Sequence, residues 1–293
     1  MIPGRRRLGN YRLRRACTAP VAAYAPRVRF ALLVFVACKS SGGGGDDGPA
    51  PDAAVAAHTG SVFIQSYDGM NVPGTPTRGG QVSAGFYTAP ATCTTMQTIG
   101  PCTVRSCPAG SSQGAFSAGT ISISGAAKPL SLVPGADKVY TPQTSTTPLF
   151  AGGETITFAA TGADVPAFTL SVTAPTKGTI TAPAKPAAGA LLGITRAQDF
   201  SVSWNGGGSG TIQVFLTGPG NQPALFCTYP ASAGSGKVPT AALMTMAAGM
   251  GSFAMSTISE AQSTAGDWAV LANVYFNAVW PDAALVSGGS MLQ

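Results

Sequence analysis

Apolar residues recur at every second position through most of the chain, from residue 61 almost to the C-terminus. In the segment 211–217, for example, Ile212, Val214 and Leu216 share one side of an extended chain. Successive side chains of a strand point to opposite faces, so this period predicts half-buried β-strands. The 38 glycines and 23 prolines are too many for a helical protein and supply the turns between short strands. The sequence therefore predicts an all-β fold.

About a dozen such segments separated by turns are typical of an immunoglobulin-like β-sandwich, or of two sandwich subdomains packed together. We expect a cysteine-containing subdomain over 61–128 and a sandwich domain over 129–293. The segment 94–107 is predicted to form a hairpin turning at Gly100-Pro101, and the glycine-rich segment 205–210 to join the strands 199–204 and 211–217 as a second hairpin. One short helix is expected over 239–248, where a proline opens the segment and Gly249 ends it.

Positive charge is concentrated at the N-terminus. Residues 1–37 hold eight arginines and no acid, whereas residues 38–293 hold nine basic and eleven acidic residues. The formal net charge of +6 therefore belongs to the leader, and the later basic residues are scattered singly. A nucleic-acid-binding protein masses its basic residues along one surface, so we expect no nucleic-acid partner.

The leader has the form of an export signal. Eight apolar residues, Phe30–Ala37, follow the arginines; as a helix they would span about 12 Å, too little to cross a bilayer. Residues 1–37 are therefore predicted to be a signal peptide. The run Phe35-Val-Ala-Cys38 resembles the lipobox of bacterial lipoproteins, which implies that Cys38 becomes the lipidated first residue, with Phe35 standing where the family usually has leucine.

Residues 38–60, rich in glycine, aspartate and proline, would then form a flexible tether between membrane and domain. Lys39 is not the aspartate that retains many lipoproteins in the inner membrane, so an outer-membrane location in the cell envelope is favoured, facing either the periplasm or the outside. A plain secreted protein is the alternative.

Four further cysteines remain after Cys38: Cys93, Cys102, Cys107 and Cys227. An even number in an exported chain predicts two disulfides, with three possible connectivities. A local Cys93–Cys102 bond with a long-range Cys107–Cys227 bond is favoured. A zinc site is not expected, because the spacing is unsuitable and the single histidine, His58, falls in the predicted tether.

The search for catalytic residues gives no complete set. Serine catalysis needs a base, and His58 is poorly placed to be one. Hydrolysis by two carboxylates stays open, since acids distant in sequence can converge in a fold. A plainer interpretation is that Asp137, Asp164, Asp199 and Asp267 accept backbone hydrogen bonds at strand ends and turns. We expect no metal site and no cofactor.

Nine aromatic residues could line a sugar-binding face, but most alternate with apolar residues, so packing in the core is favoured. They are Tyr67, Phe86, Tyr87, Trp204, Phe226, Tyr229, Trp268, Tyr275 and Trp280.

Together, the lipobox, the tether, the Gly-Pro-Cys-x4-Cys cluster (100–107), the run Gly-Ala-Asp-Val-Pro-Ala-Phe (162–168) and the strand Asp-Phe-Ser-Val-Ser-Trp (199–204) resemble the uncharacterised lipoproteins of myxobacteria and their relatives. The resemblance implies export and a β fold but no chemistry.

The sequence thus predicts a cell-envelope lipoprotein, held to the membrane by its lipid, that displays a disulfide-bonded β-sandwich. A non-enzymatic role is expected, either adhesion or binding of a glycan or protein ligand, or a structural role in the envelope. The alternative is a secreted hydrolase that uses paired Asp/Glu carboxylates.

Overall fold

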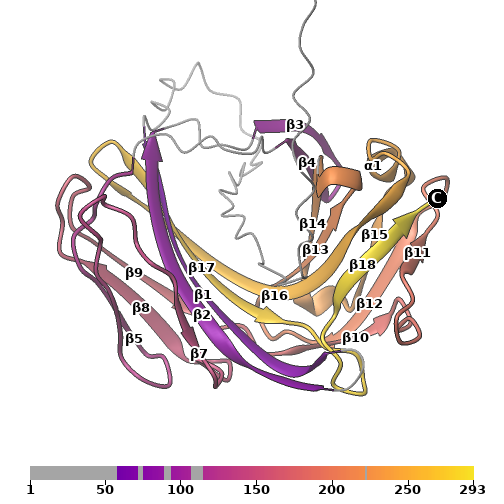
Figure 1. Ribbon diagram of the computed structural model, residues 1–293, viewed down its shortest axis with the longest axis horizontal. Coiled ribbons are helices and arrows are strands. Elements are labelled where there is room, and N and C mark those ends of the chain that lie inside the picture. The colour runs from indigo at the N-terminus through magenta and orange to yellow at the C-terminus, as the bar shows by residue number, and fades with distance from the viewer. Residues whose placement is uncertain (1–57, 72–74, 89–93, 107–114, 222) are drawn as a thin grey trace, which may run out of the picture. The chain divides into compact units, whose positions relative to one another are not determined.

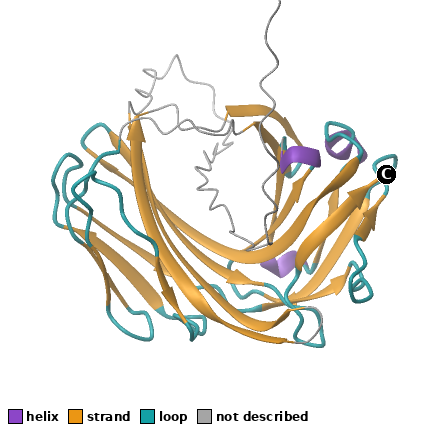
Figure 2. Ribbon diagram, in the orientation of Figure 1, coloured by secondary structure: helices purple, strands orange, loops and turns teal. Residues whose placement is uncertain are grey.

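Strands supply nearly all the regular structure, which confirms the predicted all-β sandwich (Figures 1 and 2). The computed structural model describes residues 58–71, 75–88, 94–106, 115–221 and 223–293. The leader, the tether up to residue 57, Cys38, Cys93 and Cys107 lie outside these residues.

One large sheet of eleven strands organises the described part of the chain. Nine strands follow one another in the order β3-β4-β14-β13-β16-β17-β1-β2-β7, while β18 pairs with β16 and β11 pairs with β18. The bounds are β1 (His58–Asn71), β2 (Thr75–Thr88), β3 (Thr94–Ile99), β4 (Cys102–Ser106), β7 (Gln143–Ser145), β11 (Leu192–Ile194), β13 (Thr211–Thr217), β14 (Ala224–Pro230), β16 (Gly249–Ala265), β17 (Trp268–Asn277) and β18 (Ser287–Leu292). Strands from both sides of the expected division at residues 128–129 contribute to this sheet.

Two smaller sheets accompany the large one. The first has the order β6-β5-β8-β9 and the second the order β10-β12-β15. Their bounds are β5 (Ile121–Ser124), β6 (Leu130–Leu132), β8 (Thr155–Ala160), β9 (Phe168–Thr173), β10 (Gly178–Ala182), β12 (Phe200–Gly206) and β15 (Ser235–Val238).

Each small sheet closes a hydrophobic core against the large sheet. In the first core, Val62 and Val274 of the large sheet pack with Ile156 and Phe158 of β8. The second core joins β4, β13, β14 and β16 to β10, β12 and β15. The alternation of apolar residues that predicted the strands is thus the alternation of core-facing side chains.

Both cores lie on the same face of the large sheet. Directly opposed residues of paired strands share a face, and one such row runs from Phe276 through Thr257 to Ile212. Phe276 belongs to the first core and Ile212 to the second. We call this side the first face and the opposite side the second face.

The hairpin expected between the segments 199–204 and 211–217 is wrong. β12 pairs with β10 and β15 in a small sheet, whereas β13 pairs with β14 and β16 in the large sheet. Gly206, Gly207 and Gly208, all with positive φ, carry the chain from one sheet to the other instead of folding it back. The other expected hairpin is confirmed over the described residues, since β3 pairs with β4 and Ile99 lies opposite Cys102.

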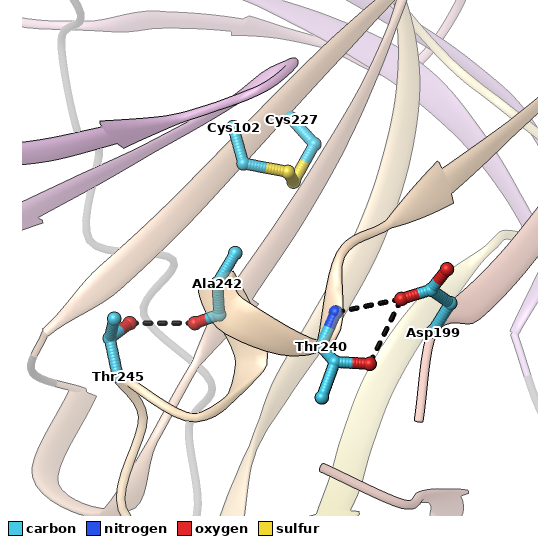
Figure 3. The surroundings of a disulfide bond; sticks show 6 residues. All are labelled: Cys102, Asp199, Cys227, Thr240, Ala242 and Thr245. Carbon is cyan, nitrogen blue, oxygen red and sulfur yellow. Dashed lines mark hydrogen bonds between the residues drawn. A yellow bond between two sulfur atoms is a disulfide. The ribbon is translucent and has the colours of Figure 1, made fainter. Parts of the chain in front are cut away.

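A single α-helical turn, α1 (Thr240–Leu243), lies within the segment predicted to be helical. Asp199 caps it from 41 residues away, its Oδ1 accepting hydrogen bonds from Thr240 N and Oγ1 at 2.9 Å each (Figure 3). Short 3₁₀ turns occur at η1 (Pro219–Asn221) and η2 (Ala231–Ala233). Within the described ranges, no helix has the length and apolar character needed to cross a membrane.

Candidate functional site

A disulfide joins Cys102 of β4 to Cys227 of β14, where the two residues lie directly opposite each other (Figure 3). Both cysteines are fully buried in the second core. The preferred pairings, Cys93–Cys102 and Cys107–Cys227, are therefore wrong. They assumed a local bond between Cys102 and Cys93, but strand pairing places Cys227, 125 residues away, beside Cys102.

Polar and aromatic side chains occur together on the second face, the side of the large sheet turned away from both cores. The alternation of the strands assigns these side chains to it: Phe63 and Gln65 of β1, Asn273, Tyr275 and Asn277 of β17, Ser256 and Glu260 of β16, Gln213 and Phe215 of β13, Phe226 of β14, and Arg105 of β4. The second face also carries Ile258 and Leu271, whereas the first face is apolar with few polar groups.

Two pairs of aromatic rings lie on the second face. Phe63 and Tyr275 meet edge to face with ring centroids 6.3 Å apart. Phe215 and Phe226 lie 5.0 Å apart, and the Arg105 guanidinium carbon stands 5.4 Å from the centre of the Phe226 ring. These are favourable geometries for aromatic and cation–π contacts, and they fix the rings in place.

Polar side chains lie between the two aromatic pairs. Gln65 Nε2 donates to Asn277 Oδ1 at 2.6 Å. In register, Asn277 lies opposite Ser256 and Ser256 opposite Gln213. Because neighbouring strands are about 4.8 Å apart, amide and hydroxyl groups follow one another across the sheet.

Two buried polar atoms on the second face have no partner. Asn273 is 1% exposed and Ser61 is 2% exposed, yet Asn273 Oδ1 and Ser61 Oγ make no hydrogen bond. Both residues adjoin Phe63, since Asn273 is its register partner on β17 and Ser61 lies two residues before it on β1. A buried acceptor left unsatisfied costs about 1–3 kcal/mol, and both side chains are closed off from solvent in this structure.

Burial and two charged residues shift the pKa of the Tyr275 hydroxyl. Burial raises the pKa of its hydroxyl above the ordinary value, nearby Glu260 raises the pKa further, and Arg105 lowers it. Three strands separate β4 from β17 in the sheet, and the Arg105 guanidinium stands over the Phe226 ring of β14. Arg105 and Glu260 are the charged residues that the described strands place on this face, and their charges cancel.

Most acids available for hydrolysis are engaged elsewhere. Asp137, Asp164 and Asp199 accept backbone hydrogen bonds from Val139, Ser117 and Thr240, as predicted. Asp267 differs, since it pairs with His58. Asp68 pairs with Arg78 and Asp282 pairs with Lys185. Glu154 accepts hydrogen bonds from the N–H groups of Ala151 and Gly152.

His58 is part of the fold, contrary to its expected position in the tether. It is the first residue of β1, its ring stacks on Trp268 at 4.5 Å, and its Nε2 lies 3.3 Å from Asp267 Oδ2. The sequence did not reveal that His58 belongs to the fold. Its neighbour Trp268 lies 210 positions further along the chain and comes beside it only through the parallel pairing of β1 with β17.

A depression of about 400 Å³ is lined by Asp68, Gly69, Met70, Arg78, Lys177 and Ala283. Its carboxylate is already engaged, since Asp68 Oδ1 accepts from Arg78 Nε at 2.7 Å and Lys177 Nζ lies 3.9 Å from Oδ2. Across the ranges given above, no group of three His, Cys, Asp or Glu residues comes together to hold a metal ion.

The aromatic residues weighed as a sugar-binding surface divide between the two faces. Phe86, Trp204, Tyr229, Trp268 and Trp280 are buried in the cores, which confirms the expected packing for these five. By strand alternation, Tyr67, Tyr87, Phe226 and Tyr275 lie on the second face instead. Phe63 and Phe215 belong there too and were not singled out, because alternation alone does not say which face meets a core.

No protein-family model matches this chain, and no curated protein matches it. Among solved structures, it is similar to the crystal structure of a tetra-tandem repeat in the extending region of a large adhesion protein, at 14% identity and a TM-score of 0.20. That match covers 74% of this chain and 48% of the other, so it spans about half of that protein's chain.

Proposed function

We propose that this protein is a cell-envelope lipoprotein whose disulfide-bonded β-sandwich binds a ligand on the second face of its large sheet and does not catalyse a reaction. The observation that carries the proposal is the composition of that face. It combines the half-buried rings of Tyr275 and Phe215 with a half-buried row of amides and hydroxyls formed by Gln65, Asn277, Ser256 and Gln213. Binding sites combine apolar contact area with a few polar groups that set orientation in this way.

The arrangement of the acids supports binding over hydrolysis. A glycosidase needs two carboxylates about 5–9 Å apart across a shared space. Glu260 is the one acid that the described strands bring to the second face, while Asp137, Asp164 and Asp199 serve turns and caps.

The anchor is proposed from the leader. Lipidation of Cys38 after removal of residues 1–37 would hold the domain in the envelope, with an outer-membrane location favoured. Metabolic labelling with an alkyne fatty acid tests this in cells that express the full chain. We expect label on the wild type and on Cys17→Ala, and none on Cys38→Ala. Equal labelling of Cys38→Ala would refute the anchor.

The binding role is tested with the full chain carrying Cys38→Ala, probed on arrays of glycans and of envelope proteins. We expect at least one array feature to be bound, and binding to be lost in Phe215→Ala, which removes a ring from the second face. Thr169→Ala, on the exposed side of β9, is the matched control and should bind normally. Absence of binding to every feature, or binding that Phe215→Ala leaves unchanged, would overturn the proposal.

A further inference from the structure

We infer that two copies of this chain associate by pairing their β9 strands antiparallel, edge to edge, so that the β6-β5-β8-β9 sheet continues from one copy into the other. This inference goes beyond the proposed function and concerns a different part of the molecule. β9 (Phe168–Thr173) is the last strand of its sheet, and β8 is the one strand of the described residues that pairs with it (Figure 1). A strand in this position presents free backbone donors and acceptors with which another extended chain can pair.

The backbone groups of Thr169, Ser171 and Thr173 point away from β8. In an antiparallel pair, residues that exchange hydrogen bonds with the partner strand alternate with residues that turn their N–H and C=O groups outward. Ala174 N donates to Glu154 O at 2.7 Å, and these two residues lie opposite each other where the β8–β9 register is extended by one position. Ala174 and every second residue before it therefore bond toward β8. Thr169, Ser171 and Thr173 are exposed, and no backbone hydrogen bond joins them to a described segment outside their own sheet.

β9 lacks the features that protect edge strands from pairing. Such strands are usually very short, carry a charged residue or a proline, or are interrupted by a bulge. Every other terminal strand of the described sheets has one of these features. The register shifts within the pairs of β3 and of β10, β15 contains Lys237, and β6, β7 and β11 are three residues long. β9 has six uncharged residues, Phe-Thr-Leu-Ser-Val-Thr, in an unbroken register with β8.

The side chains of β9 match a second copy of the same strand. From 169 to 173 the chain reads Thr-Leu-Ser-Val-Thr, so hydroxyl and apolar residues follow in the same order from either end. If Ser171 lies opposite Ser171 of the second copy, Thr169 lies opposite Thr173 and Leu170 opposite Val172. Each outward N–H group then meets an outward C=O group of the other copy. This self-complementarity favours a second copy over an unrelated extended peptide.

The same pairing continues the apolar layer of the sheet. Leu170 and Val172 point into the first core, whereas the hydroxyl residues between them point to solvent. β9 lies at the margin of that core, since Leu170 is 6% and Val172 4% exposed while Ile156 and Phe158 of the neighbouring β8 are fully buried. A second β9 beside the first would cover this margin with apolar side chains, and burial of apolar surface favours association.

The test exchanges charges at the centre of the pairing. Ser171→Lys would place two ammonium groups opposite each other, and Ser171→Glu two carboxylates, which opposes pairing. An equal mixture of the two variants would instead place opposite charges together. Both substitutions lose the contact of the Ser171 hydroxyl with Thr157 Oγ1 at 2.9 Å, so a change in the fold would affect them alike and would not be reversed by mixing.

Sedimentation equilibrium of the full chain carrying Cys38→Ala measures the association. We expect a reversible dimer whose dissociation constant rises about fivefold in Ser171→Lys and in Ser171→Glu, and returns to the wild-type value in their mixture. Ser122→Lys, on the exposed side of β5 in the same sheet, is the matched control and should dimerise normally. Thr169→Ala keeps every backbone group of the edge and should also dimerise normally.

Three results would overturn the inference. The first is a wild-type chain that stays monomeric up to the highest attainable concentration. The second is a dimer that both Ser171 variants leave unchanged, or that Ser122→Lys weakens equally. The third is a mixture of the Lys and Glu variants that associates no better than either variant alone. None of these results bears on ligand binding by the second face, so the proposed function stands or fails separately.

Discussion

Cys102 and Cys227 stand directly opposite each other on β4 and β14, and their disulfide closes a loop of 125 residues at one side of the large sheet. The bond lies in the second core, beside the residues that seat α1. It therefore joins the early strand β4 to the later part of the chain covalently as well as by strand pairing.

We expect the double substitution Cys102→Ala/Cys227→Ala to lower the free energy of unfolding by about 5 kcal/mol, because an open chain of this length has much more conformational freedom when unfolded. Guanidinium unfolding under oxidising conditions measures the difference. In a reducing agent, the wild type and the double variant should have almost the same free energy of unfolding. A loss below about 1 kcal/mol under oxidising conditions would contradict the expected role of the bond.

Tyr140→Phe should destabilise the protein by about 1–3 kcal/mol. The Tyr140 hydroxyl accepts from Ala118 N at 2.8 Å and donates to Gly119 O at 2.7 Å, so its removal leaves two backbone groups without a partner. Tyr229→Phe is the matched control, because the buried Tyr229 hydroxyl has no hydrogen bond. Its unfolding free energy should stay the same or rise. Equal effects of the two substitutions in urea unfolding would contradict this distinction.

Asp164 should make stability depend on acid pH. The Ser117 N–H at 2.9 Å, and then the Lys138 ammonium at 3.0 Å, lower the pKa of the Asp164 carboxyl below its ordinary value. In the unfolded chain this carboxyl has a pKa of about 3.9. Above that pH the ionised Asp164 makes its full contribution to the free energy of unfolding, and the contribution is lost as the pH falls through the lower pKa of the folded protein.

Asp164→Asn should accordingly be less stable than the wild type at pH 7, with the difference disappearing in strong acid. Thermal unfolding across the pH range measures this. Lys128→Met, a substitution at an exposed lysine, should track the wild type at every pH. A difference for Asp164→Asn that is independent of pH would show that ionisation of Asp164 is not the cause.

Gly251→Ala should disrupt β16. A Cβ atom at this position would lie 1.8 Å from the carbonyl oxygen of Thr217, and the backbone of β13 cannot yield by that amount without losing strand pairing. Gly288→Ala on β18 meets nothing within 4 Å and should be neutral or slightly stabilising. Soluble yield and Tm compare the two; a Gly251→Ala protein as stable as Gly288→Ala would contradict the predicted clash.

Local features of the chain were readable because they depend on neighbouring residues. Alternation around Ile212 and Val214 predicted a strand, and Gly100-Pro101 predicted the β3–β4 hairpin. The turn that Asp199 caps was recognised from a proline followed by small apolar residues. In each case the deciding interactions lie within a few residues, or concern which side of a strand is apolar.

The candidate binding face was not readable in the same way. Phe215, Phe226 and Trp204 all occur in strands whose apolar residues alternate with other residues. The alternation alone therefore does not show which side of each strand packs against a small sheet. Only the pairing of β13 with β14 and β16 shows that both small sheets lie on the opposite side.

By itself, the sequence determined the all-β class, the extended segments and the concentration of positive charge in the leader, because a period of two and a count of charges are local properties. The tertiary structure decided which strands pair, that Cys102 meets Cys227, and that Asn273 and Ser61 lie buried without partners beside Phe63. Strand pairing between distant segments depends on the packing of the whole chain, and an extended segment carries little information about its neighbour.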